Sequence, residues 1–452
     1  MSLPPKPFID LLPNELIDEI LQDLPRSDIS SLRLSCKFLA NFGVKYLLTE
    51  AHAILTLDSF HQLLETSKSP VAQEYVTSLF WEGDSVPELY WGDKMTRWKQ
   101  MIETDLKPHE QQYSIASAYD RAEFARKYAV RKSVGQQGQM TTQAFAQYLR
   151  NVKMQGIFDR LDKDALIGIV RGFPHLRSIT LSLRNGIRSR TDDLTHAFST
   201  GLYPAWKDEN GLLGPINSVI AAILTASRKI KSIDSFHCGY ITCKPLGLLS
   251  LFPEILGRLK NLSLAISSRD DDDTRGSPDS QGCAQALSDL SLHLAIECAS
   301  NLQELKIHFE WDEPYPANFL YVVSSSTWSS LRRVDFGSMG ATEDILINFF
   351  ERHAATIRDL SLSRFKITQG SWASALPRLQ SILALYRVNI SGYISSEELK
   401  EYWYLDDGPG MHQWEASRTK RAIERYLLHG GECPLHRPFT YPMTRAVALR
   451  RT

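Results

Sequence analysis

Residues 12–38 read LPNELIDEILQDLPRSDISSLRLSCKF, and this stretch begins with the signals of a helix. Pro13 suits a first helical turn, where its missing N–H costs nothing, and Glu15 favours the positive end of the helix dipole. Apolar residues then recur every four positions at Leu12, Leu16, Ile20 and Leu24, with Ile17 and Leu21 beside them. This spacing predicts one helix with a broad apolar stripe, which Pro25 ends.

Two further short helices are expected before residue 48. Ser27 is a candidate cap for the second helix, which carries Ile29 and Leu32, and Ser35 is a candidate cap for the third. The third helix would run through Leu39, Phe42, Tyr46 and Leu47. Three helices in about 40 residues are too few to enclose this much apolar surface, because domains of this size are marginal alone. We therefore expect another chain to cover part of the stripe.

The Leu-Pro-x-Glu opening at Leu12 and the Ser-Cys-Lys-Phe close at Ser35 together resemble an F-box, with the domain spanning residues 8–48. The resemblance implies three helices that dock on the small adaptor subunit of a cullin-RING (SCF-type) ubiquitin ligase. Carried over by motif position, the adaptor-facing residues are Leu12, Pro13, Leu16, Ile20, Leu24, Ile29, Leu32 and Cys36. The alternative is a plain N-terminal helical cap that buries the same residues within the chain.

The composition describes an ordinary globular protein: 452 residues, 43% hydrophobic and 23% charged, with a formal net charge of −1. Near-neutral charge gives no electrostatic argument for nucleic acid or an anionic membrane as a partner. No apolar run reaches the roughly 18 residues of a spanning helix, and the start MSLPPKPFID lacks a signal-peptide pattern. Six cysteines are too sparse for a disulfide framework. We expect an intracellular protein, in the cytoplasm, the nucleus or both.

A pattern of three apolar residues first occurs as Val76-x2-Leu79-x-Trp81 and then recurs along the chain. Further copies begin at Leu176, Leu259, Leu302, Leu331 and Ile357, and degraded copies begin at Ile230 and Leu379. Positions 302, 331, 357 and 379 are 29, 26 and 22 residues apart, with helix-like stretches at 342–354 and 371–376 between them. The pattern resembles the strand segment of a leucine-rich repeat and implies an irregular solenoid over residues 49–390. The alternative is a general α/β fold with several short parallel strands.

Two insertions and a terminal segment complete the predicted organisation. Residues 82–156 are rich in aromatic residues and read as a helical insertion, and residues 269–282 read as a surface loop. Residues 391–452 contain Tyr402-Trp403-Tyr404, a helix expected from Trp414 to His429, and Gly430-Gly431 as its stop. The stretch 421–435 resembles the end of repeat-bearing F-box proteins of filamentous fungi. The predicted fold class is therefore α+β or α/β: a three-helix F-box, a leucine-rich-repeat-like solenoid and a C-terminal cap with a tail.

No catalytic signature is present: the chain lacks a Gly-x-Ser-x-Gly elbow, a phosphate loop, a dinucleotide fingerprint and a His-Glu-x2-His motif. Two trios invite a zinc interpretation, but neither has the paired spacing of a tetrahedral site: His237, Cys238 and Cys243, and His429, Cys433 and His436. We expect no cofactor and no metal. The arginines best placed to recognise a phosphorylated or acidic target peptide are Arg184, Arg188 and Arg190. The alternative is a solvated loop neutralised by Asp192 and Asp193.

The resemblance and the motifs together predict a non-catalytic receptor. Its F-box would hold the ligase adaptor, and through it the cullin, while the repeat domain holds a protein target of unknown identity. Tethering of this kind raises effective concentration and needs a rigid spacer between the two sites. The alternative is an adaptor-bound scaffold without a role in ubiquitin transfer.

Overall fold

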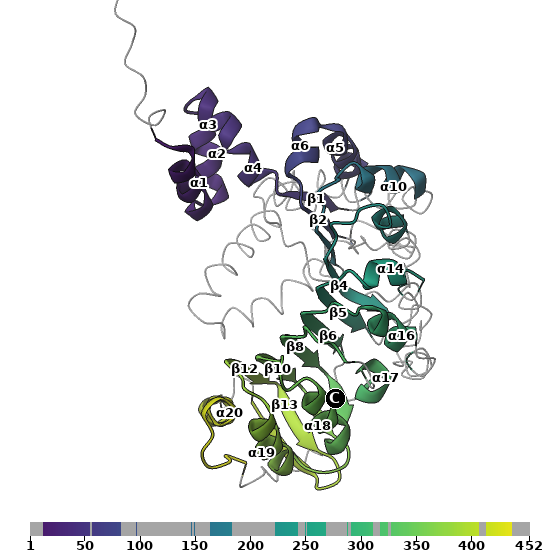
Figure 1. Cartoon of the computed structure of the whole chain (residues 1–452), viewed down its shortest axis with the longest axis vertical. Coiled ribbons are helices and arrows are strands. Elements are labelled where there is room, and N and C mark those ends of the chain that lie inside the picture. The colour runs from purple at the N-terminus through teal and green to yellow at the C-terminus, as the bar shows by residue number, and fades with distance from the viewer. Residues whose placement is uncertain are drawn as a thin grey trace, which may run out of the picture.

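The computed structural model describes residues 12–54, 57–82, 163–182, 222–242, 251–267, 291–310, 317–323, 327–405 and 413–435, with a few isolated positions between them. Within these ranges the protein is a mixed α/β structure, in which a small group of N-terminal helices precedes a long, open, mostly parallel sheet (Figure 1). The predicted insertions at 82–156 and 269–282 lie almost entirely outside the described residues.

The N-terminal group contains four helices: α1 (Asn14–Asp23), α2 (Arg26–Arg33), α3 (Lys37–Phe42) and α4 (Val44–Leu47). Pro13 and Pro25 occupy the N-cap positions of α1 and α2, so the cap predicted at Ser27 is wrong because α2 has already begun at Arg26. The cap predicted at Ser35 is also wrong by one residue. Cys36 is the N-cap of α3, and its Sγ accepts from the Leu39 N–H at 3.5 Å.

The main sheet has nine strands within the described residues, all pairing parallel in an order that follows the chain. They are β1 (Glu50–Ile54), β2 (Ser78–Glu82), β3 (Ser178–Ser182), β4 (Ser235–Thr242), β5 (Asn261–Ser267), β6 (Glu304–Glu310), β8 (Arg333–Gly337), β10 (Asp359–Ser363) and β12 (Arg387–Ser391). Parallel neighbours require a crossover between each pair.

Helices occur in those crossovers, and α10, α14, α16 and α17 line one side of the sheet (Figure 1). Between β1 and β12 the structure describes helical residues 222–227 and the helices α5 (Leu57–Lys68), α6 (Pro70–Tyr75), α10 (Lys163–Arg171), α14 (Pro253–Leu256), α16 (Ser291–Cys298), α17 (Phe319–Val323), α18 (Glu343–Arg352) and α19 (Trp372–Ile382). The helices predicted at 342–354 and 371–376 correspond to α18 and α19.

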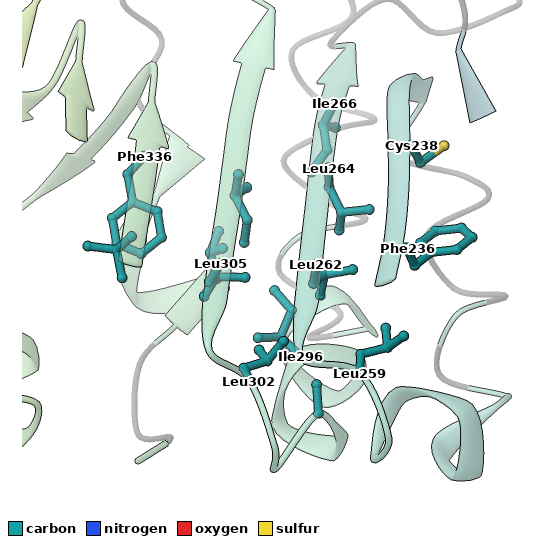
Figure 2. Close-up of a cluster of buried hydrophobic side chains, with 14 of the residues drawn as sticks. Phe236, Cys238, Leu259, Leu262, Leu264, Ile266, Ile296, Leu302, Leu305 and Phe336 are labelled. Carbon is teal, nitrogen blue, oxygen red and sulfur yellow. The ribbon is translucent and has the colours of Figure 1, made fainter. Parts of the chain in front are cut away.

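The strand register stacks the predicted apolar pattern into two continuous rows, which are buried except at Val388, a partly buried residue at the end of the first row. Figure 2 shows Phe236, Leu262 and Leu305 in the first row on three neighbouring strands. The full first row is Ala51, Leu79, Ile179, Phe236, Leu262, Leu305, Val334, Leu360 and Val388. The second row is Ala53, Trp81, Leu181, Cys238, Leu264, Ile307, Phe336, Leu362 and Ile390. These rows form the core of the sheet.

The register corrects both degraded copies of the pattern. On β4 the core positions are Phe236 and Cys238, whereas Ser235 pairs with Asn261 on the opposite face. At the last strand the predicted Leu379 copy lies on α19, and β12 begins only at Arg387. The Leu379 prediction failed because apolar residues at this spacing also arise on helices, which the pattern alone does not distinguish from strands. The Ile230 prediction failed because Ile233 is followed by Phe236 at the same spacing, and the copy that pairs in the sheet begins at Ile233.

A second, smaller sheet follows the ends of the later strands. Its order is β14-β13-β11-β9-β7, formed by β7 (Ala317–Asn318), β9 (Met339–Ala341), β11 (Lys366–Ile367), β13 (Tyr393–Ser396) and β14 (Glu401–Tyr404). Between long and short strands the chain turns at Ser338, Arg364 and Gly392, which all have left-handed φ values of 55°, 49° and 75°. The Ser338 N–H donates to the Ser363 carbonyl at 2.8 Å, and the Arg364 N–H donates to the Ser391 carbonyl at 3.0 Å. Three successive units therefore share one corner geometry.

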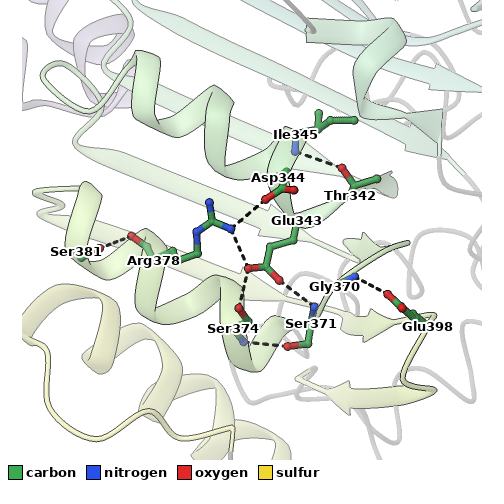
Figure 3. A network of polar contacts seen from close by, with 10 residues as sticks. All are labelled: Thr342, Glu343, Asp344, Ile345, Gly370, Ser371, Ser374, Arg378, Ser381 and Glu398. Carbon is green, nitrogen blue, oxygen red and sulfur yellow. Dashed lines mark hydrogen bonds and ion pairs between the residues drawn. The ribbon is translucent and has the colours of Figure 1, made fainter.

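A buried carboxylate joins two of these units (Figure 3). Glu343, at the start of α18, accepts from the Ser371 N–H at 3.1 Å and from the Ser374 hydroxyl at 2.7 Å. It also pairs with Arg378 Nη1 at 3.1 Å. Gly370, with φ of +96°, lies against it, and an added Cβ would be 2.6 Å from Glu343 Oε2. The first turn of α19 is thus held by the preceding unit.

Helix α20 (Gln413–His429) closes the far end of the main sheet, as the sequence predicted for a helix at 414–429. It packs against β12 and α19. The Glu424 carboxylate accepts from the Ile390 N–H at 3.2 Å, which occupies part of the open edge of β12. Gly430 and Gly431 follow the helix with φ of +73° and +111°, as expected for glycines that end a helix.

Candidate functional site

The N-terminal helices have a small core of their own, separate from the core of the sheet. On α1, Ile17 and Leu21 point into it and are each only 2% exposed. Ile29 from α2 and Leu39 from α3 complete this core. Four buried apolar residues are a small core, so the stability of this unit is limited without a further contact.

The other side of the α1 stripe faces outward. Leu16 is 45% exposed and Ile20 is 49% exposed, and Pro13 is also exposed. These residues are three and four positions apart, so they lie on one face of the helix. Leu34, directly after α2, is 89% exposed. The domain therefore presents large apolar side chains to solvent on two of its elements.

The predicted adaptor-facing residues divide into three groups. Pro13, Leu16 and Ile20 are exposed, whereas Ile29 is 3% exposed and lies inside the small core. The remaining four are partly buried and pack against that core: Leu12, Leu24, Leu32 and Cys36. Sequence reasoning missed Leu34, since it does not fall on the helical spacing of Ile29 and Leu32.

A polar cluster fixes α4 against α1. Asp18 on α1 forms an ion pair with Lys45 and accepts a hydrogen bond from the Tyr46 hydroxyl. The hydrogen bond from Lys45, followed by that from Tyr46, lowers the pKa of the Asp18 carboxyl. The cluster holds the last helix of the group in place directly before the sheet begins.

The connection from α4 to the sheet is short. Only residues 48 and 49 separate α4 from β1. The Thr49 carbonyl accepts from the N–H groups of Thr77 and Ser78, both at 3.0 Å, at the start of β2. The helical group is therefore attached to the first two strands by hydrogen-bonded backbone rather than by a flexible linker.

Comparison with protein families identifies the helical group. The model of the F-box domain family matches residues 9–42. Those residues form an F-box domain. F-box domains in general bind the small adaptor of SCF-type ubiquitin ligases, and through it the cullin scaffold, and the proteins that carry them are generally non-catalytic substrate adaptors. No curated protein matches the chain.

The zinc interpretation finds no support in the described residues, among which no group of three His, Cys, Asp or Glu side chains could hold a metal ion. His237 and Cys238 are successive residues of β4 and point to opposite faces of the sheet. Burial raises the pKa of the Cys238 thiol to about 12, so it remains protonated. Cys243 and His436 lie outside the described residues.

The predicted target-binding arginines, Arg184, Arg188 and Arg190, also lie outside the described residues. Within the described ranges, no helix is both long enough and apolar enough to cross a membrane.

The face of the sheet opposite the core carries a charged cluster that sequence reasoning missed. Asp335 on β8 lies 2.7 Å from His308 Nε2 and 3.1 Å from Lys306 Nζ, both on β6. Burial alone would raise the pKa of Asp335, but the hydrogen bond from His308 and the charge of Lys306 lower it to about 2. The sequence does contain a signal for this cluster. Its side chains alternate with the core residues along β6 and β8, so they belong to the opposite face of the sheet.

Proposed function

We propose that this protein is the substrate-recognition subunit of an SCF-type (cullin-RING) E3 ubiquitin ligase, acting inside the cell. The observation that carries the proposal is the exposure of the apolar side chains of Leu16 and Ile20 on α1, and of Leu34 directly after α2, on a domain that matches the F-box family. Burying a half-exposed Leu or Ile side chain gains about 1 kcal/mol. An adaptor that covered this face would therefore gain affinity and stabilise a domain whose own core is small.

We further propose that residues 49–390 form an irregular leucine-rich-repeat-like solenoid, with residues 391–452 as its cap and tail. The chain-ordered parallel strands and the three equivalent corners at Ser338, Arg364 and Gly392 support this proposal. So does the position of α20 against β12, because open solenoids need a terminal cap for solubility. The solenoid would hold the target protein.

Catalysis in such a complex depends on position, because ubiquitin is transferred by another subunit. The target must be held where its lysines meet the ubiquitin-loaded conjugating enzyme. A stiff spacer raises the effective concentration of these lysines near that enzyme. The two-residue connection after α4 and the bonds at Thr49 support a stiff spacer here.

The alternative function is an adaptor-bound scaffold that does not direct ubiquitin transfer. The two proposals differ in the fate of a captured protein. Partners isolated with the full chain should become ubiquitinated in a reconstituted ligase, and this should be lost when Leu16→Ser and Ile20→Ser remove the apolar face. Partners that are captured but never modified, with the adaptor bound, would favour the scaffold.

A further inference from the structure

Helix α20 carries a row of basic side chains on its outer face. Arg418, Arg421, Arg425 and His429 are all exposed, and their spacings of three, four and four residues place them on one side of the helix. At 1.5 Å per residue the row is about 16 Å long. Ile423, Tyr426 and Leu427 point the opposite way, into the core.

The row stands in a strongly basic part of an otherwise acidic chain. From residue 413 to residue 452 there are eight Lys and Arg and three Glu, although the whole chain has a net charge of −1. After Glu432 the chain contains four arginines and no Asp or Glu. Residues 433–452 therefore contain no carboxylate side chain that could neutralise the row.

The described residues around the helix do not neutralise it either. Glu424 is the acidic side chain described within the helix, and it is engaged with the Ile390 N–H at 3.2 Å and with Lys420 at 4.0 Å. Among the described residues, no ion pair joins Arg418, Arg421 or Arg425 to a carboxylate. Among the described side chains, these three exposed guanidinium groups therefore have no carboxylate partner.

The helix dipole does not explain the first two arginines. Basic side chains in or near the last turn are favourable at the negative end of the helix dipole, which explains His429 and, in part, Arg425. Arg418 and Arg421 lie in the first half and the middle of α20, where like charges three or four residues apart destabilise a helix. Glu415 and Glu424 lie three residues from Arg418 and Arg421 in the sequence, and each offsets part of this repulsion.

We infer that the outer face of α20 binds an acidic segment of a partner protein. Guanidinium groups form paired hydrogen bonds with carboxylates, and a single row of them fits one extended chain. The described part of this face contributes no aromatic side chain for base stacking, and the negative charge of the remaining chain repels a long polyanion, which disfavours nucleic acid. Figure 1 shows α20 at the outside of the molecule, where a partner can reach it. The inference does not depend on adaptor binding.

The test is a binding titration of the full chain with a fluorescent 12-residue Glu-rich peptide at low salt. The Arg418→Gln/Arg421→Gln variant should bind roughly tenfold more weakly, the loss expected for two charge-assisted contacts. The control Arg171→Gln/Arg332→Gln removes the same charge at exposed positions elsewhere and should bind like the native chain. Equal loss in both variants would overturn the inference, as would no binding by the native chain.

Two further measurements decide between partners and exclude misfolding. Single-stranded DNA of the same length, or vesicles containing anionic lipid, should bind more weakly than the peptide. Tighter binding of either, lost in the Arg418→Gln/Arg421→Gln variant, would overturn the assignment to an acidic protein. Arg421→Glu creates opposite-charge pairs with Arg418 and Arg425 and one like-charge pair with Glu424, so it should not lower the melting temperature, while it weakens peptide binding at least as much as Arg418→Gln/Arg421→Gln. A lowered melting temperature would show that Arg421 serves the fold.

Discussion

Replacing Glu343 with alanine should destabilise the fold by about 2–4 kcal/mol. The side chain is 11% exposed, and its removal leaves the buried Ser371 N–H without an acceptor, which costs about 1–3 kcal/mol. Loss of the Ser374 hydroxyl bond adds about 1 kcal/mol. The pair with Arg378, whose side chain is 41% exposed, adds a few tenths of a kcal/mol at most, because water replaces it readily.

Two matched variants sharpen this prediction. Glu343→Gln retains one acceptor oxygen and should cost about half as much as Glu343→Ala. Asp344→Asn disturbs the same arginine from a side chain that is 82% exposed, so it should cost less than about 0.5 kcal/mol. Urea unfolding followed by circular dichroism measures all three. A cost for Glu343→Ala no larger than that for Asp344→Asn would refute the argument that this carboxylate joins the two units.

Three other changes test the corners and the outer face of the sheet. Arg364→Gly should raise stability by about 1 kcal/mol, because it relieves a left-handed backbone. Gly392→Ala should lower stability by more than about 1 kcal/mol, since its Cβ would lie 2.6 Å from Arg364 Cγ; opposite signs in thermal melts are the check. The pKa of Asp335, about 2 in the folded chain, lies below its unfolded value of about 4, so the unfolded chain binds more protons between these pH values. About 2 kcal/mol of stability, present above pH 4, should therefore be lost as the pH falls towards 2, and Asp335→Asn should flatten this dependence in unfolding measured at pH 5 and pH 3.

The repeated apolar pattern predicted most of the sheet because each strand needs two residues on the core face. It missed β1, where Ala51 and Ala53 occupy those positions and give little hydrophobic signal. It placed the β4 copy three residues early, at Ile230 rather than Ile233, because Ile230 and Ile233 have the same spacing as Ile233 and Phe236. Only hydrogen-bonded register distinguishes these choices, and register depends on neighbours far away in the sequence.

The candidate adaptor surface was predictable as a segment but not side chain by side chain. A stripe that includes Leu16, Ile17, Ile20 and Leu21 covers too much of α1 for spacing to decide which half faces inward. That choice is made by where α2 and α3 pack, which leaves Ile17 buried and Leu16 exposed. The domain assignment rested on residue types at fixed separations and did not need this detail. The family match to residues 9–42 confirms it.

The most direct measurement is the affinity of the ligase's small adaptor for the full native chain, compared with its affinity for the Leu16→Ser/Ile20→Ser variant. The control is Leu251→Ser/Leu294→Ser, which changes two similarly exposed leucines, 60% and 52%, outside the F-box domain. An adaptor-binding F-box predicts equal binding by the native chain and the control, with a loss of at least about tenfold in the α1 variant at an unchanged melting temperature. Equal affinity of all three proteins, or no binding by the native chain, would contradict the assignment of this face as the adaptor interface.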